Sequence, residues 1–74
     1  MNKQEIQAIM KIIRPAVIAL YGRQPLRLVG FRDRMAYQGR ARRDMVYRIA
    51  GSDNRLYRVE VERDVISFIE EVRE

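Results

Sequence analysis

The spacing of apolar residues changes once along the chain, and this change limits the fold more than any other feature of the sequence. Over residues 3–21 the apolar residues recur at every third or fourth position, which places them on one face of an α-helix. This stripe consists of Ile6, Ile9, Met10, Ile13, Val17, Leu20 and Tyr21. From Leu26 onward apolar and polar residues alternate, as they do in a strand with one buried face. The sequence therefore predicts an α+β domain in which a helix is followed by strands.

The expected helix has a start signal, a stop signal and one residue that disturbs it. Asn2 is suited to cap the N-terminus, and Gly22 is suited to end the helix. Pro15 removes the amide that would bond to the carbonyl of Lys11. Because the apolar stripe continues in phase across Pro15, we expect one kinked helix. The alternative is a second helix that starts near Arg14.

Three strands are expected in the region of alternation. They cover Leu26 to about Tyr37, Arg43 to Ala50, and Arg55 to Glu62. Residues 38–42 and 51–54 connect them, and the second connection is rich in turn-forming residues. In the first strand Asp33 falls on the apolar side of the alternation, which predicts a bulge or bend near Gly30–Arg34.

The parity of the apolar residues predicts how the second and third strands pair. Apolar residues at odd positions in both strands share a face only if paired residue numbers have an even sum. A three-residue loop, Ser52-Asp53-Asn54, satisfies this condition. The expected pairs are Ile49 with Tyr57, Tyr47 with Val59, and Met45 with Val61. The same register places Arg48 opposite Arg58 on the other face.

Residues 65–72 fit two structures. Asp64 is a suitable N-cap, and the apolar residues that follow have helical spacing, with polar residues on the opposite side. We therefore expect a helix here, and a fourth strand is the alternative because the segment is rich in β-branched and aromatic residues. The full expectation is a single domain over residues 1–74 with α-β-β-β-α order. Both helices then pack on one face of a three-stranded antiparallel sheet.

Charge is distributed unevenly along the chain. The net charge is +5, yet residues 23–58 carry +7, from ten arginines and three aspartates. Residues 60–74 carry −4, from six glutamates or aspartates and two arginines. A basic middle with an acidic tail favours an anionic partner, unless the two regions neutralise each other within the molecule or across a dimer.

The arginines of the basic region are the candidate residues for binding a protein partner or a polyanion. They are Arg32, Arg34, Arg40, Arg42, Arg43, Arg48 and Arg58. Arginines at alternate strand positions stand roughly 7 Å apart, close to the phosphate spacing of a nucleic-acid strand. Two observations oppose a nucleic-acid partner. The tyrosines that would stack on bases fall on the apolar parity, and Glu60 and Glu62 share the arginine face.

The apolar stripe of the helix is wider than a thin three-stranded sheet requires. The candidate residues for an oligomer interface are Ile9, Ile12, Ile13 and Ala16. A domain of this size buries only about 60% of its unfolded surface, so a second chain would add stability. The alternative is that all four side chains cover the sheet of their own chain.

Composition argues against several other classes of protein. The chain has neither cysteine nor histidine, so we expect no metal site and no cofactor. No residue is assigned a catalytic role, because the serines stand alone and the strand glutamates lie beside arginines. The apolar run Ile9–Tyr21 is too short to span a bilayer and contains charged residues. No leader sequence is recognised, so we expect a cytoplasmic protein without a membrane partner.

The sequence thus predicts a small non-enzymatic protein-interaction module that forms a homo-oligomer or docks an acidic partner. Binding of nucleic acid through the arginine face and the 39–43 loop is the alternative. The position of the tyrosines discriminates between them. If Tyr47 and Tyr57 lie inside, the protein partner is favoured.

Overall fold

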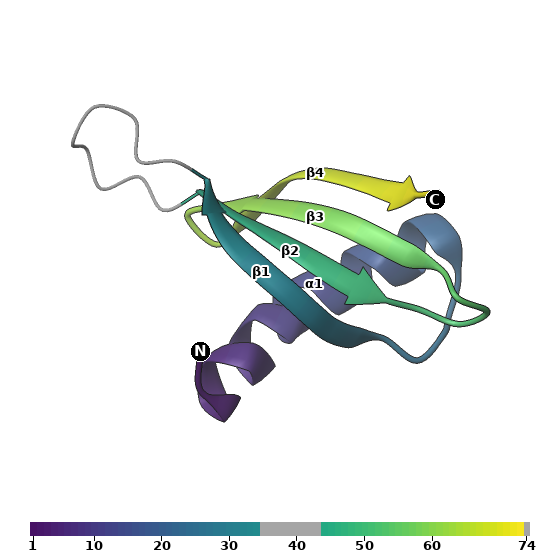
Figure 1. Cartoon of the computed structure of the whole chain (residues 1–74), viewed down its shortest axis with the longest axis horizontal. Helices are drawn as coiled ribbons and strands as arrows, with labels where there is room; N and C mark the ends of the chain where they lie inside the picture. Colours follow the sequence, from purple (N-terminus) through teal and green to yellow (C-terminus); the bar gives the residue numbers. More distant parts are fainter. Residues whose placement is uncertain (35–43, 74) are drawn as a thin grey trace.

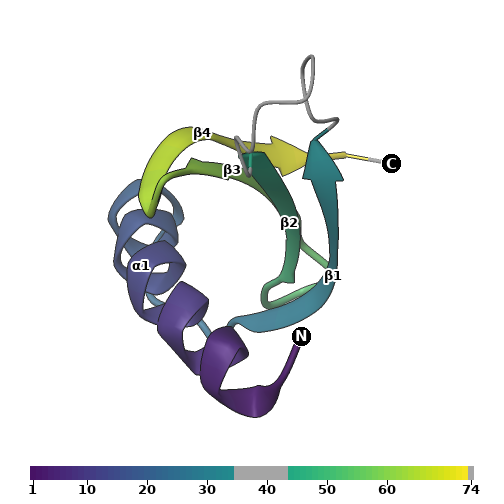
Figure 2. The same ribbon diagram turned by 90° about the vertical axis from the view of Figure 1, so that its left-hand side faces the viewer.

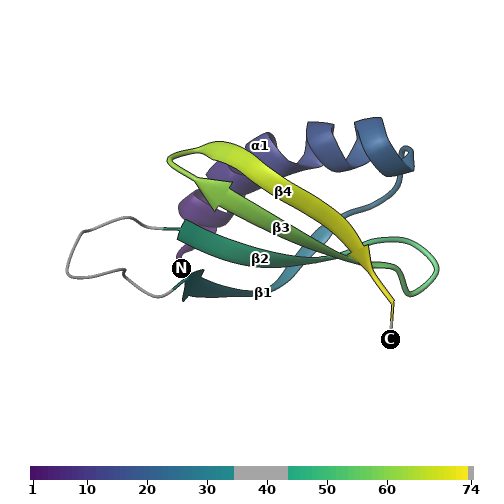
Figure 3. The ribbon, with the colours of Figure 1, turned by 90° about the horizontal axis from the view of Figure 1, so that it is seen from above.

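The computed structural model describes residues 1–34 and 44–73, which contain one helix and four strands (Figure 1). These elements are α1 (Lys3–Tyr21), β1 (Arg27–Arg34), β2 (Asp44–Ala50), β3 (Leu56–Glu62) and β4 (Val65–Val72). The strands form one antiparallel sheet in the order β1-β2-β3-β4, so each strand pairs with its neighbour in sequence (Figure 3). The predicted α+β class and antiparallel sheet are confirmed. The predictions for residues 35–43 lie outside the described residues.

Helix α1 is continuous through Pro15, so the alternative of two helices is wrong. Asn2 caps it as expected, because its side-chain oxygen accepts a hydrogen bond from the backbone N–H of Glu5 at 2.9 Å. Gly22 ends it with a φ of 95°, a conformation that favours glycine, and its N–H donates to the carbonyl of Ile18.

The pairing of β2 with β3 follows the predicted register. Ile49 lies opposite Tyr57, Tyr47 opposite Val59, Met45 opposite Val61, and Arg48 opposite Arg58. The connecting turn has Asp53 and Asn54 at φ values of 55° and 60°. Short polar side chains tolerate this left-handed conformation, so the turn brings the two strands into this register.

Residues 65–72 form strand β4, and the predicted second helix is wrong. Arg63 and Asp64 adopt φ values of 50° and 62°, which makes a tight turn that sends the chain back along β3. The sheet therefore has four strands in place of three. The β-branched and aromatic residues of this segment determine its structure, as the alternative prediction stated.

A bulge in β4 explains why its sequence resembled a helix. Phe68 lies opposite Glu60, but the next pair is Ile66 with Val61, which leaves Ser67 as an extra residue. The Ser67 hydroxyl donates to the carbonyl of Glu60 at 3.2 Å. The extra residue turns the strand so that side chains three positions apart share a face, which is the spacing of a helix.

A second bulge lies in β1, between Leu28 and Gly30, slightly before the predicted position. Val29 is the extra residue, and its side chain is exposed. After the bulge Phe31 pairs with Tyr47 and Arg32 with Val46, so Arg32 faces the same side of the sheet as Arg48.

The core lies between α1 and one face of the sheet (Figure 2). Its buried side chains are Ile9, Met10, Ile13, Val17, Tyr47, Ile49, Tyr57, Val59 and Val61. Tyr47 and Tyr57 are 5% and 0% exposed, which confirms that these tyrosines face inward. Within the described residues no helix has the length and hydropathy needed to cross a membrane.

Gln24 ties the start of the sheet to the β2–β3 turn. Its Nε2 donates to the hydroxyl of Tyr57 at 2.9 Å, and its Oε1 accepts from the backbone N–H of Ser52 at 2.9 Å. The ring of Tyr57 also packs against that of Tyr21, with centroids 4.8 Å apart. These contacts satisfy the polar end of a fully buried tyrosine.

Candidate functional site

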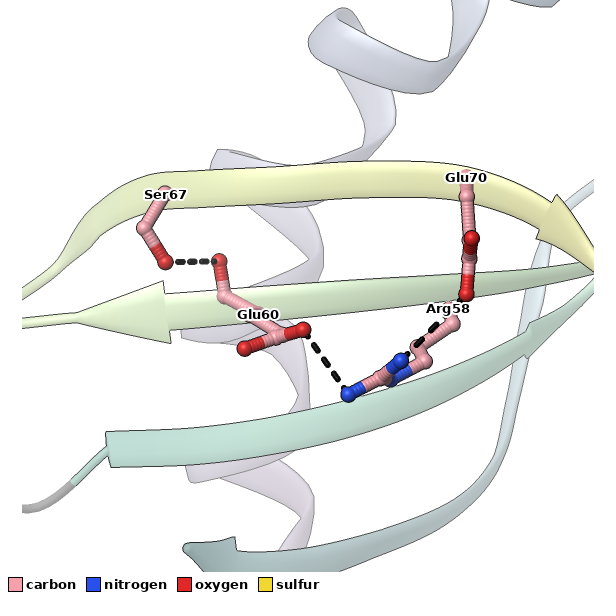
Figure 4. Close-up of polar contacts among 4 residues, drawn as sticks. All are labelled: Arg58, Glu60, Ser67 and Glu70. Atoms are coloured by element: carbon pink, nitrogen blue, oxygen red, sulfur yellow. Dashed lines mark hydrogen bonds and ion pairs between the residues drawn. The ribbon is translucent and has the colours of Figure 1, made fainter.

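The face of the sheet that points away from α1, called here the open face, carries charged and apolar side chains together. Along each strand, residues of the open face alternate with residues that point toward the core. Its residues with described side chains include Arg32, Val46, Arg48, Leu56, Arg58, Glu60, Glu62, Phe68, Glu70 and Val72. Figure 4 shows this face with α1 behind the sheet.

Arg58 is the centre of a polar network on the open face (Figure 4). Its guanidinium lies 2.9 Å from a carboxylate oxygen of Glu60 and 3.3 Å from one of Glu70. It also lies over the ring of Phe68, 5.8 Å from the centroid. Glu60 is only 6% exposed, so its charge requires this partner. Arg58 is therefore held by carboxylates of its own chain.

Next to this network lies a hollow of about 560 Å³. It is lined by Gly30, Phe31, Arg32, Val46, Arg48, Arg58 and Val72. Arg32 and Arg48 are exposed, and neither forms an ion pair with another described residue. The floor is apolar and includes Val46, which is 3% exposed although it faces away from α1. Arginines stand around an apolar floor in this hollow.

Of the seven predicted arginines, the structure brings three to this hollow: Arg32, Arg48 and Arg58. Arg34 ends β1, but its side chain lies outside the described part of the structure. Arg40, Arg42 and Arg43 belong to residues 35–43 and also lie outside it. Three strands thus contribute one arginine each to a common surface, as the alternation of side chains predicts.

A second surface, the groove between α1 and β1, has a volume of about 780 Å³. Its lining residues are Ile6, Gln7, Met10, Lys11, Arg14, Pro15, Leu26, Arg27 and Leu28. Lys11, Arg14 and Arg27 are exposed on its rim, without an ion pair to a described residue. Among the described residues, none that lines this groove is acidic.

Strand β1 forms one edge of the sheet, because among the described strands it pairs with β2 alone. Val29 and Phe31, which belong to this strand, are each 47% exposed. An edge strand with exposed apolar side chains is a common route for docking an extended chain. Figure 2 shows β1 with its outer edge uncovered by the other described elements.

The four residues predicted for an oligomer interface divide into two groups. Ile9 and Ile13 are 7% and 0% exposed, and they cover the sheet of their own chain. Ile12 and Ala16 are half-buried beside them. Apolar surface also stays accessible at β1 and in the adjoining groove. Sequence reasoning missed this groove, although Leu26 and Leu28 signalled an apolar start to the strand.

The chain was compared with known proteins in three ways, and no family model, curated protein or solved structure matches it. Within residues 1–34 and 44–73 no three acidic, histidine or cysteine side chains are grouped so as to hold a metal ion. The function is therefore inferred from the open face and the groove.

Proposed function

We propose that the chain is a small non-enzymatic protein-interaction module that binds an acidic, partly apolar segment of a partner protein in the groove between α1 and β1. One observation carries this proposal. Apolar side chains of the groove are surrounded by three exposed cations, and none of the described residues that line it is acidic. Such a site favours a ligand that has both apolar and negatively charged side chains.

The apolar part of the groove provides the contact area. Met10 is 7% exposed and belongs to the core, and Ile6, Leu26 and Leu28 pack against that core while staying partly accessible. Covering these side chains removes apolar surface from water, which favours binding at about 25 cal/mol per Å² before the costs of association.

The edge of β1 provides backbone hydrogen bonds for an extended partner. An unpaired strand edge presents N–H and C=O groups to which another strand can be added. Val29 and Phe31, exposed on the same strand, would contact side chains of the added segment. The bulge at Val29 interrupts the ladder and limits pairing with strands of the wrong register.

The rim selects for acidic residues. Lys11 and Arg14 are three residues apart on α1, so they lie on one side of the groove, and Arg27 stands on the other. Charges on a rim mainly increase the association rate and exclude partners of the same sign. A basic segment would therefore bind much more weakly than an acidic one.

A nucleic acid is the less favoured partner. Tyr47 and Tyr57 are inside the core, so they cannot stack on bases. Arg58 is already paired with Glu60 and Glu70. A homo-oligomer is the alternative occupant of the groove, because residues 65–72 of a second copy are also acidic and apolar.

The test compares two synthetic peptides, one alternating valine with glutamate and the other alternating valine with lysine. Fluorescence anisotropy of labelled peptides measures both affinities. We expect the glutamate peptide to bind at least about tenfold more tightly, and increasing salt to reduce the difference. Equal affinities for the two peptides would contradict the proposal. Backbone pairing with the edge of β1 alone, without the charged rim, would explain them.

Two pairs of variants locate the binding site. Arg14→Glu and Lys11→Glu reverse rim charges, whereas Arg23→Glu and Lys3→Glu make the same changes at exposed positions outside the groove. The rim variants should lower the affinity for the glutamate peptide about five- to tenfold, and the control variants should change this affinity less than about twofold. Light scattering tests the alternative occupant. If the protein is a dimer that the peptide does not dissociate, the occupant of the groove is a second copy of the chain and not an acidic partner.

A further inference from the structure

We infer that the hollow on the open face is a binding site for a small ligand that joins one oxyanion to an apolar group. This inference goes beyond the docking proposal, because the hollow lies on the face of the sheet opposite α1. Its volume of about 560 Å³ is within the range of small-molecule sites, roughly 300–1,000 Å³.

The arrangement of the three arginines is the first argument. Arg48 lies directly opposite Arg58, and Arg32 is diagonal to Arg48 because its own partner is Val46. Like charges placed opposite each other on a sheet destabilise it. The charge of Arg58 is already balanced by Glu60 and Glu70, so an oxyanion in the hollow would offset the positive charge that remains on Arg48 and Arg32.

The distribution of the carboxylates is the second argument. Both carboxylates that contact Arg58, those of Glu60 and Glu70, lie on β3 and β4. No described acidic residue reaches Arg32 or Arg48, which stand on β1 and β2. The side of the hollow formed by β1 and β2 therefore has positive charge that the described residues do not neutralise. Guanidinium groups match phosphate and carboxylate oxygens in pairs of hydrogen bonds.

The floor of the hollow is the third argument. Val46 is buried, and Val72 and Phe31 also line the hollow. Gly30 has no side chain, so the surface of β1 beside Arg48 stays bare. A Cβ at this position would meet Cδ of Arg48 at 3.9 Å, an ordinary contact. These features leave space for an apolar group next to the oxyanion.

A long polyanion fits this face less well. Glu60 and Glu62 occupy the same face further along β3, and their charges repel successive phosphates. An anion that extends from Arg48 along the face toward these residues would approach their carboxylates. The site is therefore suited to a single oxyanion.

The test uses isothermal titration calorimetry with phenyl phosphate, benzoate, inorganic phosphate and phenol. We expect phenyl phosphate or benzoate to bind more tightly than inorganic phosphate, and phenol not to bind measurably. The stronger of phenyl phosphate and benzoate shows whether the natural oxyanion is a phosphate or a carboxylate. Binding of phenol as tight as that of phenyl phosphate would overturn the inference, since the arginines would then play no part.

Variants distinguish the hollow from a general basic surface. Arg48→Gln and Arg32→Gln should each weaken binding roughly tenfold, as expected for losing hydrogen bonds to a charged group. Gly30→Val should weaken binding by occupying part of the hollow beside Arg48 without changing the charge. Arg23→Gln, an exposed arginine outside the hollow, should have no effect. Thermal unfolding of each variant checks that the fold is intact.

Two results would overturn the inference. Unchanged affinity of Arg48→Gln for phenyl phosphate and benzoate would show that Arg48 does not contact the oxyanion. Tighter binding of a single-stranded oligonucleotide, with a steep dependence on salt, would replace the small ligand with a nucleic acid. Neither result bears on the groove, because Arg14→Glu and Lys11→Glu test that site separately.

Discussion

Ile66 and Ile69 contact the core from the same face of β4 although they are three residues apart in a strand. Side chains of a regular strand share a face at even separations. The extra residue, Ser67, changes the parity between them. One bulge therefore allows an isoleucine from each half of this strand to face the core.

Deletion of Ser67 tests this relationship. The deletion leaves a regular strand in which Ile66 still pairs with Val61 and Phe68 with Glu60. We expect the free energy of unfolding to fall by about 1 kcal/mol or less, the contribution of the lost hydrogen bond to Glu60. Chemical denaturation measures it. Deletion of Val46, where β2 pairs regularly with both of its neighbouring strands, should unfold the protein.

The two carboxylates on Arg58 should contribute unequally to stability. The side chain of Glu60 is 8% exposed and that of Glu70 is 44% exposed. We expect Glu60→Gln to lower the free energy of unfolding by about 1–3 kcal/mol, since it leaves buried polar groups poorly paired. Glu70→Gln should cost no more than about 1 kcal/mol. An equal or larger effect of Glu70→Gln in urea denaturation would contradict the assignment.

Gln24 should stabilise the fold despite its position in a loop. Gln24→Ala leaves the hydroxyl of Tyr57 and the N–H of Ser52 without these partners. The expected loss is about 1–3 kcal/mol, measured by denaturation. Gln4→Ala, on the exposed surface of α1, is the matched control and should change stability by less than about 0.5 kcal/mol. An unchanged free energy of unfolding in Gln24→Ala would show that these hydrogen bonds do not stabilise the fold.

Replacement by alanine should have opposite effects on thermal stability at Gly51 and at Gly30. A Cβ on Gly51 would lie 2.7 Å from a ring carbon of Tyr57, which is fully buried, so Gly51→Ala should lower the melting temperature by several degrees. A Cβ on Gly30 would lie 3.9 Å from the nearest atom of the described residues, Cδ of Arg48. Gly30→Ala should be neutral or stabilise by up to about 1 kcal/mol, because glycine weakens a strand. Calorimetric melting of both variants tests the difference.

The sequence allowed the β2–β3 hairpin to be predicted pair by pair, because odd apolar positions in both strands require one register. It also located the caps of α1 at Asn2 and Gly22. The strand β4 was assigned wrongly because the bulge at Ser67 reproduces helical spacing. Bulges depend on pairing with a neighbouring strand, so the spacing within one segment does not reveal them.

The candidate site was predicted in part. Alternation placed Arg32, Arg48 and Arg58 on one face, and the structure brings them to one hollow. The pairing of Arg58 with Glu70 depends on β4 being a strand, so the expectation of a helix excluded it. The groove between α1 and β1 joins residues 6–15 of the helix with residues 26–28, which are distant along the chain, and only the packing of the helix reveals it.

The most direct test of the proposed function is an NMR titration of the isotopically labelled protein with the valine–glutamate peptide. The account predicts that amide signals of β1 and of the first half of α1 shift, while those of β4 stay unchanged. The valine–lysine peptide should shift them far less at equal concentration. Shifts confined to β3 and β4, or equal shifts with both peptides, would contradict docking of an acidic segment in this groove.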